Sequence, residues 1–514
     1  MIPVLSSAQA RAFDAFMGEQ CSVPSLLLME NAGRAAASLL HERLAAGEPR
    51  RVSIVCGLGN NGGDGYVVAR QLARRGWAVR VLASGPRESL APDARVNCGI
   101  WQRLGGELVL LPEAEGELRA ALAAEWAERG LVVDALFGTG LRRPLAGRER
   151  AIVESVNGSG LDVVALDVPS GLNADTGAVM GVAAKAVSTI TFGHPKTGLL
   201  TTTALDHTGE LSVADLGVPQ RLGPALEPRA RWLEASDLRA WLEPRARSTH
   251  KGRSGRVLVI GGAPGKTGAA LLAANAALRA GAGLVTICAF ADAIGSLDAR
   301  VIEVMTRPIE RDAPERALDA ALESADAVVI GPGLGLGADA RRVVDHVVFG
   351  FSGPMVLDAD ALSHFAGRAG ELGRARGPCL LTPHPAELGR LLGTSAAEVE
   401  ADRYGALERA LEASQRAVLL KGPHTLVGEP GSAPIVVSEG HPALAVGGSG
   451  DVLSGLCGAS IARLGPLHAG AFAAFVHGRA ARLWVRAHDG ADRGMLAREL
   501  ADFVPRALAE LAAG

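Results

Sequence analysis

The stretch Val446-Gly447-Gly448-Ser449-Gly450-Asp451-Val452-Leu453-Ser454-Gly455 decides how the second half of this chain is interpreted. Glycines and a serine lead directly to an acid, and an apolar run follows, which predicts a tight loop opening a buried helix. Glycines let backbone N–H groups converge, and a helix N-terminus adds partial positive charge, so phosphate is the natural ligand. Asp451 would then lie beside phosphate as a proton acceptor, or it would serve only as the helix N-cap.

Composition limits the classes of protein to which the chain can belong. Its 514 residues exceed what one hydrophobic core usually serves, so we expect two domains. The net charge of -3 and the 4% aromatic content give no support for a nucleic-acid or anionic-membrane partner. The six cysteines are scattered without a C-x-x-C pair, and the N-terminus lacks a basic region before an apolar core. We therefore expect a soluble cytoplasmic protein with reduced, mostly core cysteines.

The first half alternates short apolar runs with helix-length segments. Residues 3–46 look helical, with Ser7 as a possible cap, and helices are also expected at Tyr66–Arg75 and Glu115–Glu128. Strands are predicted at Val52–Cys56, Ala78–Ala83, Glu107–Leu111, Leu131–Ala135, Asp162–Leu166, Ser188–Phe192 and Glu210–Val213. This alternation predicts a largely parallel sheet covered by helices on both faces.

A proline- and arginine-rich stretch separates a second alternating pattern from the first. We predict domains at 1–225 and 249–514, joined by a linker at 226–248 in which Ala235–Leu242 could form a short helix. The predicted strands of the second domain are Arg256–Ile260, Leu284–Cys288, Ala327–Ile330, Met355–Leu357, Cys379–Leu381, Ala417–Leu420 and Pro434–Val437. No repeat relates the halves, so they are interpreted as two different α/β units fused in one chain.

The first half contains the glycine loop Gly57-Leu58-Gly59-Asn60-Asn61-Gly62-Gly63-Asp64-Gly65 after a strand. G-x-G-x-x-G alone is a weak signal, and a dinucleotide dehydrogenase should carry an acid at the end of the next strand. That strand ends in Leu82-Ala83-Ser84-Gly85-Pro86 without one, which disfavours a hydride-transfer enzyme.

Two further strands of this half end in acids, Asp134 and Asp167, and the carboxyl ends of parallel strands converge on one crevice. Asn61, Asp134 and Ser170 would form an all-oxygen cluster suited to a hard cation. The turn Gly138–Pro144 adds Arg142 and Arg143 for a substrate phosphate. Alternatively, the two acids only cap loops.

Three motifs of the first half resemble the NAD(P)HX epimerase family: N-N-G-G-D-G at 60–65, D-A-L-F-G-T-G-L at 134–141 and L-D-V-P-S-G-L-N-A-D-T-G at 166–177. That family interconverts the R and S forms of hydrated NADH or NADPH. The resemblance implies a Rossmann-like three-layer α/β/α fold and a potassium ion held by Asn61, Asp134 and Ser170. It implies Asp167 as a catalytic residue contacting the nicotinamide part. The implied substrate contacts are Asn60, Asn61, Gly62, Gly63, Asp64, Gly138, Thr139, Gly140, Leu141, Arg142, Arg143, Pro144 and Asp167.

In the second half, Gly265-Lys266-Thr267 is not a P-loop, because Gly261 stands one residue too close for G-x-x-x-x-G-K-[ST]. Asp358-Ala359-Asp360, Thr382-Pro383-His384-Pro385-Ala386-Glu387 and Lys421-Gly422-Pro423-His424-Thr425 each follow a strand. Alone, His384 would be structural. Together with Lys421 and the Gly447–Asp451 loop, it favours a phosphate-handling site.

This set resembles the ribokinase-like superfamily. Within it, K-G-R-S-G-R-V-L-V-I-G-G at 251–262, L-T-P-H-P-A-E at 381–387 and A-V-G-G-S-G-D-V-L-S-G at 445–455 are most similar to the ADP- or ATP-dependent NAD(P)H-hydrate dehydratases. The resemblance implies that Asp451 activates the substrate hydroxyl as a base, with Ala269, Gly333 and His384 also facing the hydrate. It implies nucleotide contacts at Lys421, Gly422, Pro423, His424, Thr425 and Gly450. Ser449 stands where the motif has threonine, and it keeps the hydroxyl.

Both resemblances point to one substrate, so the sequence predicts a bifunctional NAD(P)H-hydrate repair enzyme. Its expected cofactors are potassium in the first domain and magnesium with ADP or ATP in the second. Its expected partners are these small molecules and further copies of itself as a homo-oligomer, without nucleic acid or membrane. One alternative is a ribokinase-like small-molecule kinase fused to a non-catalytic nucleotide-binding domain.

Overall fold

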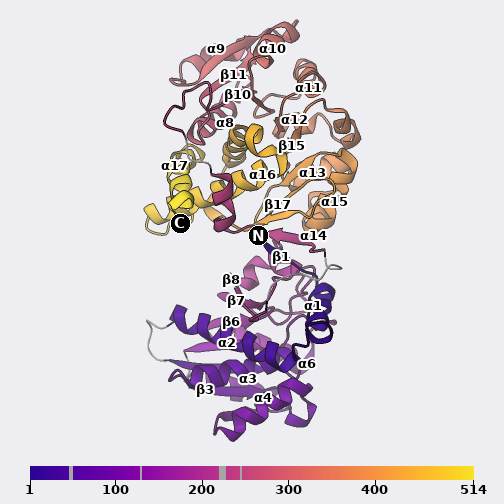
Figure 1. The fold of residues 1–514 in the computed structure, drawn as a ribbon, viewed down its shortest axis with the longest axis vertical. Helices are drawn as coiled ribbons and strands as arrows, with labels where there is room; N and C mark the ends of the chain where they lie inside the picture. Colours follow the sequence, from indigo (N-terminus) through magenta and orange to yellow (C-terminus); the bar gives the residue numbers. More distant parts are fainter. Residues whose placement is uncertain (45–49, 128–129, 219–226, 243–245, 514) are drawn as a thin grey trace. The chain divides into compact units, whose positions relative to one another are not determined.

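The computed structural model describes residues 1–44, 50–127, 130–218, 227–242 and 246–513. The chain divides into two compact units, Ile2–Ala230 and Arg231–Gly514, each with its own α/β core (Figure 1). Residues 226 and 243–245 of the predicted linker lie outside the described residues. Its residues 230–232 form a strand and Ala235–Trp241 a 3₁₀ helix in which Leu238 is fully buried.

The N-terminal unit contains one parallel sheet in the order β4-β3-β2-β5-β6-β7-β8. The strands of this unit are β1 (Ile2–Val4), β2 (Arg51–Cys56), β3 (Ala78–Ala83), β4 (Glu107–Leu110), β5 (Leu131–Ala135), β6 (Asp162–Leu166), β7 (Ser188–Phe192) and β8 (Glu210–Ala214), of which β2 to β8 form this sheet. Its helices are α1 (Ser7–Glu19), α2 (Ser25–Leu44), α3 (Asn60–Ala73), α4 (Pro92–Arg103), α5 (Glu115–Trp126), α6 (Gly147–Asn157) and α7 (Leu205–Thr208). The direction of strand order reverses between β2 and β5, which is where ligands bind in open α/β sheets.

Successive residues of β2 belong to two separate hydrophobic cores, one on each face of the sheet. The unit therefore has three layers, with helices on both sides of the sheet. Ile54 packs with α2, α3 and α4 on one face, whereas Val55 packs with α5 and α6 on the other. The expected α/β/α arrangement is therefore confirmed. Glycines allow α3 to approach the sheet closely, because a Cβ at Gly62 would lie 2.0 Å from the Gly57 carbonyl oxygen.

The C-terminal unit contains a mixed sheet whose strands run in the order β9-β18-β17-β16-β15-β14-β13-β10-β11-β12. These strands are β9 (Ala230–Trp232), β10 (Arg256–Ile260), β11 (Leu284–Phe290), β12 (Met305–Ile309), β13 (Ala327–Ile330), β14 (Met355–Leu357), β15 (Cys379–Leu381), β16 (Ala417–Leu420), β17 (Thr425–Gly428) and β18 (Ile435–Val437). Strands β10 to β16 are parallel, and β17 is antiparallel to both of its neighbours. Strand order reverses between β10 and β13, a position at which open α/β sheets commonly bind ligands.

The helices of this unit are α8 (Thr267–Arg279), α9 (Ala291–Asp298), α10 (Pro314–Leu322), α11 (Ala338–Gly350), α12 (Ala359–Ser363), α13 (Pro385–Leu392), α14 (Ala396–Ala401), α15 (Arg403–Ser414), α16 (Ser449–Ala487) and α17 (Ala497–Ala513). Helix α16 crosses the sheet and packs against β13 to β18, α8 and α17 (Figure 1). It is kinked at Gly465–Pro466. By length and composition α16 alone among the described helices could span a membrane, but 61% of its most apolar window is buried in the protein, as in a core helix.

Several expectations about single elements were wrong. The first helix is capped by Ser6 rather than Ser7, since Ser6 Oγ accepts from the Gln9 N–H in a capping box. Helix α3 begins at Asn60, six residues before the predicted Tyr66, because its glycines pack against β2 instead of forming an open loop. Strands β1, β9, β12 and β17 were not predicted, since each is short or lies beside a proline- or arginine-rich segment. The cysteine expectation is confirmed, since all six are free and only Cys21 is exposed.

Candidate functional sites

The carboxyl ends of β5 and β6 bring Asp134 and Ser170 into direct contact. Asp134 is buried and accepts hydrogen bonds from Ser170 Oγ (2.6 Å), the Ser170 N–H (2.8 Å) and the Leu136 N–H (3.2 Å). Burial raises the pKa of Asp134 above its ordinary value, although these hydrogen bonds partly lower it. Asp134 thus holds the loop that contains Ser170, as the alternative interpretation expected. In the described part of the chain, however, its buried carboxyl group has no cationic partner.

Asn61 lies next to this pair. Its Oδ1 and Nδ2 are buried and make no hydrogen bond among the described residues. A Cβ added to Gly138 would lie 3.4 Å from Asn61 Cβ, so Asn61 lies beside the loop that contains Phe137 and Gly138. Ser170 contacts the same loop, because its Oγ accepts a hydrogen bond from the Phe137 N–H at 2.8 Å. An unsatisfied buried amide oxygen is costly unless a ligand uses it. The chemistry of these side chains fits a hard monovalent cation.

Asp167 directly follows β6 with a positive φ of 63°, and its strongest partner was not predicted from the sequence. Lys196, which is 4% exposed, places its Nζ 2.6 Å from Asp167 Oδ1. The same ammonium donates to Thr191 Oγ1 (3.0 Å) and to the Phe192 carbonyl (3.1 Å). Lys196 lies four residues beyond the last residue of β7, Phe192, so proximity to a strand end was the signal that could have found it.

Asp64 lies at the start of the second turn of α3 and is 8% exposed. Burial raises the pKa of Asp64 well above its ordinary value; Asp167 and Asp14 raise it further, and Lys196 lowers it. The predicted substrate residues Asn60 to Asp64 therefore form the beginning of a helix, with Asn61 and Asp64 about one turn apart. Across the crevice, a Cβ at Gly138 would lie 2.7 Å from Asp167 Oδ2.

The turn Gly138–Pro144 connects this interior cluster to the surface. The Thr139 N–H donates to Asp167 Oδ2 at 3.3 Å. Gly140, Arg142, Arg143 and Pro144 are exposed, and Leu141 is half-buried. Arg143 lies 3.6 Å from Glu149, an exposed pair of little energetic weight.

In the C-terminal unit, the predicted residues gather where β10, β13, β14 and β16 end and α16 begins. Gly333, with a φ of 62°, lies beside Ala269, since a Cβ there would come 3.2 Å from that of Ala269. Lys266 pairs with Asp360 at 3.3 Å instead of facing a Walker-type loop, which agrees with the rejection of a P-loop.

Asp451 occupies the first turn of α16, and Gly448 with a φ of 91° is the N-cap. The alternative that Asp451 is merely the N-cap is therefore wrong. Burial raises the pKa of Asp451 to about 7; Asp358, Asp360 and Glu387 raise it as well, and Lys421 lowers it. A carboxyl group with this pKa can accept and release a proton near neutrality.

Asp358, which was not singled out as a site residue, is the most buried acid of this cluster at 1% exposed. It accepts from Lys421 Nζ (2.8 Å), Thr382 Oγ1 (2.9 Å) and Ser454 Oγ. Burial opposes the charge of Lys421, but Asp358 and Glu387 raise the Lys421 pKa overall. A Cβ at Gly450 would lie 3.4 Å from Lys421 Nζ, so the ammonium stands at the N-terminus of α16.

The two histidines of the predicted site differ in placement. His384 is exposed and caps α13, with Nδ1 accepting from the N–H groups of Ala386 (3.1 Å) and Glu387 (3.2 Å). His424 turns inward to Ser438 Oγ (2.8 Å), and burial lowers the His424 pKa to about 4. Gly422 and Pro423 are exposed, and Thr425 Oγ1 donates to the Gly422 carbonyl.

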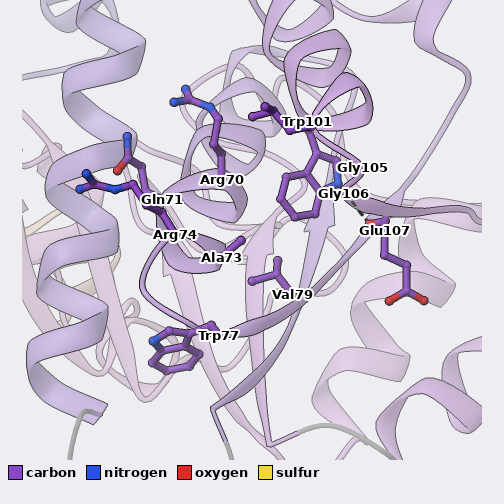
Figure 2. Close-up of a pocket in the computed structure, with 11 residues that line it drawn as sticks. Arg70, Gln71, Ala73, Arg74, Trp77, Val79, Trp101, Gly105, Gly106 and Glu107 are labelled. Carbon is purple, nitrogen blue, oxygen red and sulfur yellow. Dashed lines mark hydrogen bonds between the residues drawn. The ribbon is translucent and has the colours of Figure 1, made fainter.

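A separate cavity of about 580 Å³ lies in the N-terminal unit, where α3 ends and β3 and β4 begin (Figure 2). Several of its polar side chains have partners: Arg70 and Gln71 contact Glu30, and Trp77 Nε1 donates to His41. It lies at the amino ends of the strands, opposite the crevice that holds Asp134 and Asp167. It is therefore not a candidate for the catalytic site.

Comparisons with known proteins cover both units. The family description NAD(P)H-hydrate dehydratase matches residues 257–506, and the YjeF-related protein N-terminus matches residues 25–198. The bifunctional NAD(P)H-hydrate repair enzyme Nnr of Moorella thermoacetica is 39% identical over 99% of this chain and 97% of its own length. The enzyme of the same name from Salinibacter ruber is 38% identical over 99% of this chain and 96% of its own length. Among solved structures, the ADP/ATP-dependent NAD(P)H-hydrate dehydratase of Bacillus subtilis, co-crystallized with ATP and magnesium, is 30% identical; it matches 55% of this chain and 99% of its own with a TM-score of 0.49.

Proposed function

The chain belongs to the family of bifunctional NAD(P)H-hydrate repair enzymes, and on that basis we propose the division of labour between its two units. The N-terminal unit epimerises the R and S forms of hydrated NADH or NADPH. The C-terminal unit dehydrates the S form with ADP or ATP and releases AMP or ADP and phosphate. The alternative, a kinase fused to a non-catalytic binding domain, would not explain why buried acids gather around Asp167.

The observation that carries the dehydratase assignment is the position of Asp451. It lies in the first turn of α16 with a pKa near 7, beside the Lys421 ammonium and after the glycines of an anion-binding loop. Asp451 takes the proton of the hydrate hydroxyl as that oxygen attacks the terminal phosphorus of the nucleotide. The phosphate ester then leaves as phosphate, with loss of a ring proton, and the reduced nicotinamide ring is restored.

We assign the binding residues of the C-terminal unit as the family resemblance implies. Ala269, Gly333 and His384 bind the hydrate, whereas Gly450 and the segment 421–425 bind the nucleotide. Magnesium bound with the nucleotide would neutralise its phosphate charge. The buried ion pair of Asp358 with Lys421 fixes the ammonium beside the anion-binding loop.

In the N-terminal unit, Asn61, Asp134 and Ser170 would hold a potassium ion, which would screen charge next to the substrate. The unsatisfied Asn61 oxygen and the unpaired buried carboxyl of Asp134 support this assignment. The substrate lies along the first turn of α3 and the turn Gly138–Pro144, with Asp167 at the reacting carbon. We also propose a cytoplasmic location and a homo-oligomeric assembly. Light scattering of the purified protein measures the oligomeric state.

The direct test supplies the protein with mixed R- and S-hydrate, magnesium and either ADP or ATP. Recovery of reduced-nicotinamide absorbance from the whole hydrate pool, with one phosphate released per molecule, is the expected result. A stable phosphorylated hydrate would instead indicate the kinase alternative. Recovery of only the S portion at enzyme speed would refute the epimerase assignment.

We expect the dehydratase rate to increase with pH through about 7. The reacting form of Asp451 is the carboxylate, and its pKa is raised to about 7, so protonation inactivates the base on the acid side. The kcat/KM for the S-hydrate, measured between about pH 5 and pH 9, should lose about tenfold per pH unit below the inflection. A profile that is flat from about pH 5 to pH 8 would contradict the role of Asp451 as base.

Cutting the chain near residue 225 should give two soluble pieces, because each unit has its own core. The C-terminal piece should consume only S-hydrate, and the N-terminal piece should only interconvert R and S. Chromatography of the hydrate epimers measures both activities, with the uncut chain as control. Failure of both pieces to fold would show that neither unit is independent.

A further inference from the structure

The inference below rests on the proposed epimerase function and concerns how the hydrated carbon is inverted. In the hydrate, the hydroxyl-bearing carbon is bonded to the ring nitrogen, whose lone pair can expel the hydroxyl if a proton is supplied. Inversion then requires water to return to the opposite face and lose a proton there. Such a reaction needs an acid on one side and a base on the other.

The described residues provide two carboxyl groups with different surroundings in this crevice. Asp167 receives a charge-assisted hydrogen bond from the Lys196 ammonium at 2.6 Å, which stabilises its ionised form. Lys196 is itself fixed by Thr191 and the Phe192 carbonyl. The ammonium therefore fixes the position of Asp167, whose second oxygen is turned toward Gly138 and the Thr139 N–H.

Asp64 has the opposite surroundings. Its side chain is buried at the start of the second turn of α3, and within the described residues its carboxyl group has neither an ion pair nor a hydrogen bond. The charged groups that act on it are Asp167, Lys196 of the segment after β7, and Asp14 of α1; the Cys56 thiol of β2 also lies near. The Lys196 ammonium acts on all three carboxyl groups, those of Asp14, Asp64 and Asp167, and it contacts Asp167 directly. The remaining buried carboxyl is consequently most stable when protonated.

Gly138 lies between the two arms of the crevice. A Cβ there would come 2.7 Å from Asp167 and 3.4 Å from Asn61, which precedes Asp64 by one helical turn on the same face of α3. The absence of a side chain at position 138 leaves space beside Asp167 and the start of α3. We assign the flat ring to that space, near both Asp167 and the helix that carries Asp64.

We propose that Asp64 is the acid that protonates the departing hydroxyl and that Asp167, positioned by Lys196, is the base that takes a proton from the returning water. The carbon–oxygen bond breaks with its electron pair going to oxygen, and water leaves. The ring nitrogen lone pair forms a carbon–nitrogen double bond. Water then adds to the opposite face, and its proton passes to Asp167. The reverse inversion uses the same groups with their roles exchanged, so no oxidant, reductant or nucleotide is consumed.

The first experiment follows oxygen exchange by the wild-type chain. Mixed hydrate is incubated without nucleotide in water enriched in ¹⁸O, and chromatography and mass spectrometry measure inversion and label uptake, with the enzyme-free rate subtracted. Each inversion should introduce one solvent oxygen. Inversion with retention of the original oxygen would overturn the proposal, because the ring would then have opened at the carbon–nitrogen bond instead.

The second experiment uses Asp64→Asn, which keeps the size of the side chain and removes the proton. The kcat for R-to-S conversion should fall about 10²- to 10⁴-fold with KM little changed, while dehydration of S-hydrate by the same chain is retained. The matched control is Asp162→Asn, an exposed residue at the opposite end of β6. An Asp64→Asn protein that inverts within about tenfold of wild type would overturn the proposal.

Lys196→Gln tests the positioning role separately. Removing the ammonium should lower kcat for inversion with KM little changed, because Asp167 loses the group that holds it in place. An unchanged kcat with a folded protein would show that Lys196 is only structural. If wild type dehydrates S-hydrate but never inverts R, the epimerase assignment itself fails, an outcome distinct from inversion that is insensitive to Asp64.

Discussion

Asp451→Asn is expected to reduce dehydration of S-hydrate by about 10²- to 10⁴-fold while nucleotide still binds. The substitution keeps the shape of the side chain in the first turn of α16 but removes the proton acceptor. The glycine loop and Lys421, to which we assign the binding of the nucleotide phosphates, are unchanged. Turnover with saturating ATP and magnesium measures the first effect, and calorimetric titration with nucleotide measures the second.

The matched control for this variant is Asp326→Asn. Asp326 is exposed at the amino end of β13, the opposite edge of the same sheet, where it accepts from the Arg256 N–H. That variant should retain normal turnover. Near-normal turnover by Asp451→Asn would remove Asp451 from the mechanism, and loss of both turnover and nucleotide binding would indicate a collapsed loop instead.

Asp167→Ala is expected to abolish epimerisation and to leave the dehydratase active, and the structure favours Asp167→Asn as the cleaner form of the test. Asp167 has a φ of 63°, a conformation that asparagine adopts more readily than alanine. Alanine would also leave the buried Lys196 ammonium without its carboxylate, a loss that typically costs about 3–5 kcal/mol. Asparagine keeps a hydrogen-bond acceptor for Lys196 and cannot take up the proton.

With mixed hydrate and excess nucleotide, wild type should convert the whole pool to NADH. Asp167→Asn should stop once the S form is gone, leaving the R form to its slow spontaneous epimerisation. Thermal unfolding of the same sample separates lost chemistry from lost stability. Rapid, complete conversion by the folded variant would refute a catalytic role for Asp167.

Much of the architecture could be predicted from the sequence, because parallel buried strands are short apolar runs that end in glycine or acid. Strands such as β5, β6, β10 and β16 were predicted with their observed bounds. Asp451 and Asp167 could be singled out for the same reason, since strand ends and helix starts at a switch point are where ligands bind. The pattern did not predict β12, because Arg307 and Pro308 interrupt its apolar run. It did not predict β17, because this strand lies too close to the preceding one.

The sequence by itself determined the two α/β units, their family resemblances and the chain positions of the reacting acids, because hydrophobic periodicity and glycine spacing are local properties. Only the tertiary structure decided the partners of those acids. Lys196 meets Asp167 across 29 residues, and Lys421 meets Asp358 across 63. Such pairings depend on how parallel strands are ordered in the sheet, and the protonation of Asp64 and Asp451 depends on burial and on charges brought together by folding. No run of neighbouring residues contains that information.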